Sequence, residues 1–161
     1  MWRKSCLALG AMLLLASEGQ AATVTTTFTT QITIAAACII NSASNLNFGA
    51  AGVIAANIDQ TSTIQVQCTN TTPYSISLDA GTGTGATVAA RKMTNGANTV
   101  TYSLYQDAGR TNVWGNTIPT NTVPGTGNGA SQSYTVYGRV PPQTTPAPAL
   151  YTDTITVTVT Y

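Results

Sequence analysis

The feature that most constrains this chain is an alternation of apolar and polar side chains that recurs along most of its length. In residues 151–161 the apolar face is formed by Tyr151, Ile155, Val157, Val159 and Tyr161, and every even position is Thr. In residues 23–36 the even positions form the more apolar face, and the odd positions are Thr, Gln and a single Ala. That face carries Val24, Thr26, Phe28, Thr30, Ile32 and Ile34. Such alternation is typical of β-strands with one buried and one exposed face, so the sequence predicts an all-β protein.

Shorter alternating segments lie between these two, bounded by the Gly, Pro, Asn and Asp residues that favour turns. We expect strands at residues 39–48, 64–68, 74–80, 100–104 and 134–140, and a short edge strand at 91–93. Long surface loops are expected at residues 80–90, 116–131 and 141–148, which are rich in Gly, Thr, Asn or Pro.

Residues 1–21 have the parts of a secretory signal peptide. The basic residues Arg3 and Lys4 precede an apolar stretch at 6–16, and residues 19–21 form a small-x-small cleavage signal. The apolar stretch is shorter than the roughly 20 residues that a membrane span requires, and no later segment reaches that length. We therefore expect export without membrane insertion, with a mature chain that begins at Ala22.

The mature chain is poor in charge. Its ionic residues are Arg91, Lys92, Arg110 and Arg139 against Asp59, Asp79, Asp107 and Asp153, with no Glu and no His. Without clustered cations, nucleic acid is not an expected partner. Without histidine to activate a nucleophile, and with the aspartates scattered, no enzyme activity, catalytic residue, metal or cofactor is expected.

Cys38 and Cys68 are the cysteines that remain after the leader, with Cys6, is removed. In an exported chain two cysteines most simply form one disulfide. Such a bond would stabilise the fold by roughly 3–4 kcal/mol in the chain-entropy model.

The strand count predicts an incomplete immunoglobulin-like β-sandwich. Six principal strands are one short of the usual minimum of about seven, if the last of them is residues 152–161. A missing last strand would leave a groove that opens onto the core, with an edge formed by Ile155, Val157, Val159 and Tyr161. The segment 22–37 is surplus to the domain 38–161, and could fill the groove of another copy, which is donor-strand complementation. Because donor and groove differ, such contacts propagate into a filament.

Alternatives remain for several of these features. The segment 23–36 could pair within its own sheet as an ordinary first strand, giving a self-complete secreted module that binds carbohydrate or a surface, or a coat protein. Trp114 could contact a ligand, although an aromatic that anchors a loop to the core is the expected role. Arg91 and Lys92 are expected to be a solvated edge that discourages wrong strand pairing.

Several motifs together resemble the spore coat protein U domain family, which includes subunits of archaic chaperone-usher pili. The resemblance covers essentially the whole mature chain. Its motifs are Cys38 with Leu46-Asn47-Phe48-Gly49, residues 64–70, 73–81, 91–93 and 102–107, Val113-Trp114-Gly115, residues 134–141 and residues 151–161. It implies a structural pilus subunit that polymerises by donor-strand exchange for adhesion and biofilm formation. It also implies a periplasmic chaperone, an outer-membrane usher and related pilin subunits as partners, and a location at the cell surface.

Overall fold

The computed structural model describes residues 19–161, so most of the predicted signal peptide lies outside the described residues. Residues 34–161 form one compact unit, and residues 19–33 belong to another. Within the described part of the chain all regular structure is β, and no helix is long and apolar enough to cross a membrane. The strands are β1 (Cys38–Ala43), β2 (Ile58–Cys68), β3 (Pro73–Leu78), β4 (Arg91–Asn95), β5 (Asn98–Tyr105), β6 (Val123–Thr126), β7 (Ser131–Val140) and β8 (Val157–Thr160).

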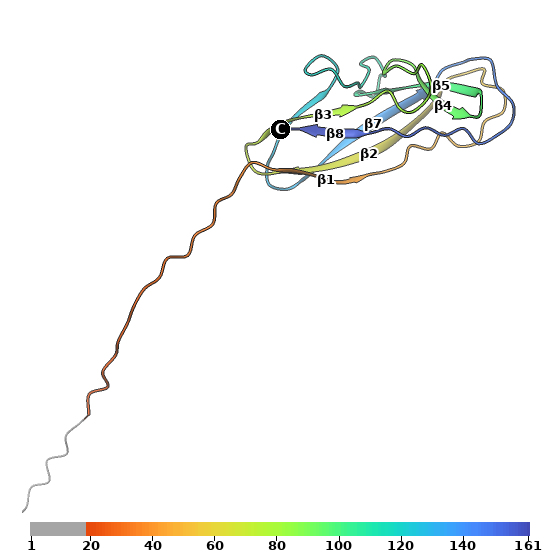
Figure 1. Cartoon of the computed structure of the whole chain (residues 1–161). Helices are drawn as coiled ribbons and strands as arrows, with labels where there is room; N and C mark the ends of the chain where they lie inside the picture. The colour runs from red at the N-terminus through yellow and green to blue at the C-terminus, as the bar shows by residue number, and fades with distance from the viewer. Residues whose placement is uncertain (1–18) are drawn as a thin grey trace, which may run out of the picture. The chain divides into compact units, whose positions relative to one another are not determined.

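Two antiparallel sheets form the compact unit (Figure 1). The larger has five strands in the order β1-β2-β7-β5-β4, and the smaller has three in the order β6-β3-β8. The longest pairing joins β2 to β7, from Ile58 opposite Val140 to Gln67 opposite Ser131. Strands from both sheets contribute to the apolar core, including Val66 of β2, Ile76 of β3, Leu104 of β5 and Val140 of β7.

Between residues 38 and 161 each expected strand is present, but the first and last are shorter than expected, and the alternating segment 23–36 forms no strand. The first ends at Ala43 rather than at residue 48, after a bulge between Ile40 and Ser42. Leu46 and Phe48 leave the sheet and pack against the core instead. The last strand is only Val157–Thr160, since residues 153–156 belong to no strand.

β6 was not expected, because it lies inside the Pro- and Gly-rich stretch that the sequence predicts as loop. It pairs with β3, with Pro124 opposite Ser75. Proline is tolerated there because β6 is an edge strand, where one side of the backbone needs no partner.

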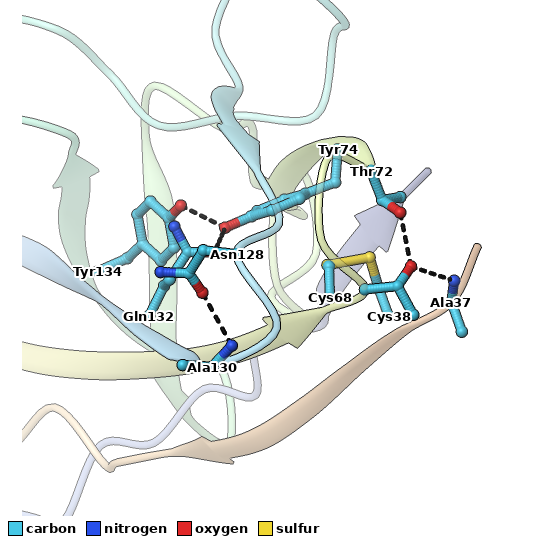
Figure 2. The surroundings of a disulfide bond; sticks show 10 residues. Ala37, Cys38, Cys68, Thr72, Tyr74, Asn128, Ala130, Gln132 and Tyr134 are labelled. Atoms are coloured by element: carbon cyan, nitrogen blue, oxygen red, sulfur yellow. Dashed lines mark hydrogen bonds between the residues drawn. A yellow bond between two sulfur atoms is a disulfide. The ribbon is translucent and has the colours of Figure 1, made fainter. Parts of the chain in front are cut away.

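A disulfide joins Cys38 at the start of β1 to Cys68 at the end of β2, as predicted (Figure 2). The two residues face one another in the β1–β2 ladder. Beside them the Thr69 hydroxyl accepts a hydrogen bond from the Ala37 backbone N–H (3.1 Å), and it lies 2.6 Å from the Thr72 hydroxyl. The beginning of the folded unit is thus held both covalently and by hydrogen bonds.

Two tyrosines close the core near this end. The hydroxyls of Tyr74 and Tyr134 lie 2.5 Å apart, and Tyr74 also donates to Gln132 (Figure 2). Burial, followed by the hydrogen bond to Tyr134, raises the pKa of Tyr74. The pair links β3 of the small sheet to β7 of the large one.

Candidate functional site: an open groove between the sheets

An apolar groove of about 970 Å³ opens between the two sheets. One wall is the stretch 43–54, which follows β1, and the other is the stretch 145–157, which leads into β8. Core side chains from both sheets form the floor, among them Ile64, Leu78, Val100, Leu104, Val136 and Val140. The groove therefore reaches down to the apolar core, although the side chains of its floor are themselves no more than 7% exposed.

The strands beside this groove are sheet edges. β1 ends the large sheet and β8 ends the small sheet, and within residues 19–161 each has one neighbouring strand. An edge strand presents backbone N–H and C=O groups that a further strand could pair. The groove thus has apolar side chains below and an edge strand at each side.

The predicted groove-edge residues divide into two groups. Ile155 and Val157 line the groove, and Val159 is partly buried against the core beside them. Tyr161 is 61% exposed and borders a separate hollow with Ile34 and residues 69–73. Sequence reasoning missed the opposite wall, residues 43–54, because it expected a strand to continue to residue 48.

The predicted donor residues are exposed and belong to no strand. Val24, Phe28, Ile32 and Ile34 are 95%, 88%, 84% and 73% exposed, and Thr26 and Thr30 are exposed as well. Large apolar side chains in a contiguous exposed row mark an interaction surface or an aggregation hazard.

Arg91 is the clearest departure from the sequence-based expectation. The prediction of a solvated edge residue is wrong, because its exposure is 0%. Its guanidinium donates hydrogen bonds to the backbone carbonyls of Asp79 (2.8 Å), Val88 (2.7 Å), Leu78 (3.3 Å) and Trp114 (2.7 Å). Burial lowers the pKa of Arg91. Lys92, on the opposite face of β4, is partly exposed, and its Nζ donates to the Thr84 carbonyl.

Two aspartates lie near this buried cation. Burial tends to raise the pKa of Asp79, but hydrogen bonds from Thr156 and Gly81 and the charge of Arg91 outweigh that effect and hold the pKa below its ordinary value. Asp153 accepts a hydrogen bond from the buried Tyr102 hydroxyl (2.8 Å), and burial, followed by that hydrogen bond, raises the pKa of Tyr102. In residues 19–161 no group of three or more His, Cys, Asp or Glu is placed to bind a metal.

Trp114 has the anchoring role that was predicted. It is 1% exposed, and its indole Nε1 donates to the Ile76 carbonyl at 2.9 Å. It is therefore a core residue and is not displayed to a ligand.

Comparison with known families matches residues 24–158 to the Spore Coat Protein U domain model. The chain belongs to the spore coat protein U domain family. Among curated proteins it is similar to Protein U of Myxococcus xanthus, with 33% identity over 166 residues that cover 94% of this chain and 92% of the relative.

A solved structure shares the fold of the present chain. It is the CsuC–CsuE chaperone–tip adhesion subunit pre-assembly complex from the archaic chaperone-usher Csu pili of Acinetobacter baumannii. The match has a TM-score of 0.57 and 24% identity, and it covers 80% of this chain but only 40% of the solved chain. The family model and the curated relative confirm the predicted membership of the spore coat protein U domain family, and the solved structure shows a shared fold over 80% of this chain. A disulfide in such a fold indicates a location outside the cytoplasm.

Proposed function

We propose that this protein is a structural pilus subunit of the archaic chaperone-usher type, an immunoglobulin-like sandwich that polymerises by donor-strand exchange. The observation that carries the proposal is the open groove of about 970 Å³ in a chain that also has an exposed, alternating apolar segment. A donor strand from a second copy would pair with the groove rim through its backbone and fill the groove with alternate side chains. Filaments of such subunits would support adhesion and biofilm formation at the cell surface.

The size of the apolar contact supports a strong interaction. Val24, Phe28, Ile32 and Ile34 would each contribute roughly 1.5–3 kcal/mol on burial, or roughly 6–12 kcal/mol together. Ordering the segment and associating two chains reduce that sum. The donor strand's backbone hydrogen bonds to the groove rim add to what remains.

The family resemblance implies the assembly route. A periplasmic chaperone would first lend a strand to the open groove, which would limit aggregation during export. An outer-membrane usher would then exchange that strand for the segment 22–37 of the next subunit. The solved relative was captured with a chaperone before assembly, which supports this order of events. The proposal treats residues 1–21 as the cleaved leader and 38–161 as the pilin domain.

Deletion of residues 22–36 tests the proposal. The shortened chain is produced in the periplasm with and without a cognate chaperone, and is compared with the full mature chain. A pilus subunit should stay chaperone-bound and accept a synthetic peptide of residues 23–36, yet form no filaments by electron microscopy.

The second candidate is a self-complete secreted module or coat component, which the family's description as a spore coat domain favours. In that case the segment 23–36 belongs to its own domain, and its deletion should lower the melting temperature sharply. Loss of folding that neither the chaperone nor the peptide restores would overturn the pilus assignment.

A further inference from the structure

One wall of the groove is held in place by few ladder hydrogen bonds. The chain passes from the large sheet, where Thr152 bonds to Thr94 of β4 (2.8 and 3.2 Å), to the small sheet, where Val157–Thr160 forms β8. Residues 153–156 lie between these contacts and belong to no strand. Asp153, Thr154 and Ile155 nevertheless line the groove, so whatever fixes this crossing also sets the position of the wall.

Side chains fix the crossing at both of its ends. Asp79, which follows β3, accepts a hydrogen bond from the Thr156 backbone N–H (3.0 Å), and its own N–H donates to the Thr156 carbonyl (3.2 Å). Asp153 accepts from both the backbone N–H (2.8 Å) and the hydroxyl (2.9 Å) of Thr82, and from Tyr102 of β5 (2.8 Å). The crossing is thereby tied to the small sheet by Asp79 and to the large sheet by Asp153.

Arg91 fixes the backbone at Leu78 and Asp79, from which one of these carboxylates extends. It is fully buried and bonds the carbonyls of Leu78 and Asp79, the backbone from which the Asp79 carboxylate reaches Thr156. Gly81 leaves room for the Asp153 carboxylate, because a Cβ at this position would overlap it. The φ of Gly81, +79°, also favours glycine. The same few residues thus place both carboxylates.

We propose that Asp79, Tyr102, Arg91 and Asp153, here called the crossing cluster, are positioning residues that hold this groove wall in register for a strand from a second copy of the chain. The inference rests on the proposed function. An incoming strand must form backbone hydrogen bonds of 2.7–3.2 Å along the wall, so a displacement of about 1 Å removes them. The cluster supplies placement, whereas the floor supplies apolar contact. Changes in the cluster should therefore impair a subunit as acceptor and leave it intact as donor.

The test measures uptake of a fluorescent peptide with the sequence of residues 23–36 by the full mature chain, using anisotropy at a temperature where every variant is folded. Asp153→Ala should slow uptake about tenfold or more, because it removes the carboxylate's bonds to both Thr82 and Tyr102. Tyr102→Phe removes only the hydroxyl and should slow uptake about threefold to fivefold. The two changes combined should slow uptake no more than Asp153→Ala alone, because they act on the same contact.

Asp107→Ala is the matched control. Asp107 also caps a loop, accepting hydrogen bonds from the Thr111 and Asn112 backbone N–H groups and the Thr111 hydroxyl, but it does not line the groove. Its loss should lower the melting temperature without slowing uptake. Each variant should also insert its own N-terminal segment into a wild-type acceptor at the normal rate, so that only its role as acceptor is impaired.

Two failures are distinguishable. If the wild-type chain takes up no peptide, the proposed function fails. If the wild-type chain takes up peptide and Asp153→Ala does so equally fast, or if Asp107→Ala is slowed as much as Asp153→Ala, the positioning role is wrong.

Discussion

Residues 23–36 and residues 151–161 carry nearly the same alternating pattern, yet they differ in burial and in secondary structure. In the last segment Tyr151, Ile155, Val157 and Val159 are partly buried against the core, and β8 pairs with β3. In the first segment the corresponding apolar side chains are exposed and no strand forms. A period of two specifies that a strand will have two faces, but it does not specify which backbone will lie beside it.

Polar anchors distinguish the two segments. Thr152 bonds to Thr94, and the carboxylate of Asp153 holds the last segment to Thr82 and Tyr102. Residues 23–36 contain no charged residue at all, so they have no comparable means of fixing themselves to one site. The first segment therefore has the pattern of a strand without the anchors that would hold it in its own domain.

The largest expected effect comes from charge on the apolar face of the first segment. Replacing Ile32 and Ile34 by Asp should abolish filaments, because each buried Ile is worth roughly 1.5–3 kcal/mol and a carboxylate there would lack a partner. Electron microscopy of surface filaments provides the measurement. The matched control places Asp at Gln31 and Thr33, on the opposite face, and should leave filaments in place. Filaments of normal length from the Ile variant would show that the donor face is wrongly assigned.

A substitution at Arg91 tests the anchoring of the last segment, because Arg91 bonds the backbone of Asp79, whose carboxylate bonds Thr156. Arg91→Ala should lower the free energy of unfolding by roughly 3–5 kcal/mol, since buried carbonyls lose a charged donor. The neighbouring Lys92→Ala should change it by less than about 1 kcal/mol, because its bond is at the surface. Urea unfolding of the chaperone-free chain gives both values, and equal effects would contradict the burial of Arg91.

Loss of the disulfide should lower the stability of the folded domain without changing how residues 23–36 bind an acceptor. With Cys38 and Cys68 both changed to Ser, the folded unit should lose roughly 3–4 kcal/mol of stability. The isolated peptide of residues 23–36 should still bind a wild-type acceptor unchanged, because it contains neither cysteine. Thermal unfolding with and without a reductant provides the comparison, and a melting temperature insensitive to reductant would argue against the bond.

The smallest effect is a pH dependence confined to the last segment. The folded-state pKa of Asp79 lies below its ordinary value of 3.8, so its stabilisation is complete above that value and is lost as the pH falls through the folded-state pKa. Asp79→Asn should therefore cost roughly 1 kcal/mol at neutral pH and progressively less below about pH 4.

Hydrogen exchange at residue 156, corrected for intrinsic rates, should report this change. Residues 23–36 contain no titratable side chain and serve as the internal reference. A difference between variant and wild type that is constant from pH 7 to about pH 3 would exclude Asp79 as the group responsible.

Much of the fold could be predicted from the sequence because burial follows alternation. Ile64, Val66, Ile76 and Leu104 are all buried where the pattern places them, and the predicted Cys38–Cys68 disulfide is present. Trp114 likewise anchors a loop to the core, which is the role expected of an aromatic residue there.

The remainder depends on contacts that have no local signature. β6 is a strand only because β3 offers it an edge, despite its Pro and Gly. Arg91 is buried because four carbonyls converge on it, three of them 12 or more residues away in the sequence, although its place on the same face of β4 as Met93 was a usable hint. Tyr161 continues the apolar face of the last segment but borders the hollow near Ile34, since the groove ends before it.

The position of the disulfide has a mechanical consequence. Cys38 forms the first rung of β1, and β1 is an edge strand whose Ile39 and Ile40 remain largely exposed. Tension applied to the chain ahead of residue 38 therefore reaches a covalent link to β2 before it loads any hydrogen bond of β1. β2 is in turn paired along nearly its whole length with β7, so the force is spread across the centre of the large sheet and does not peel its weakest strand.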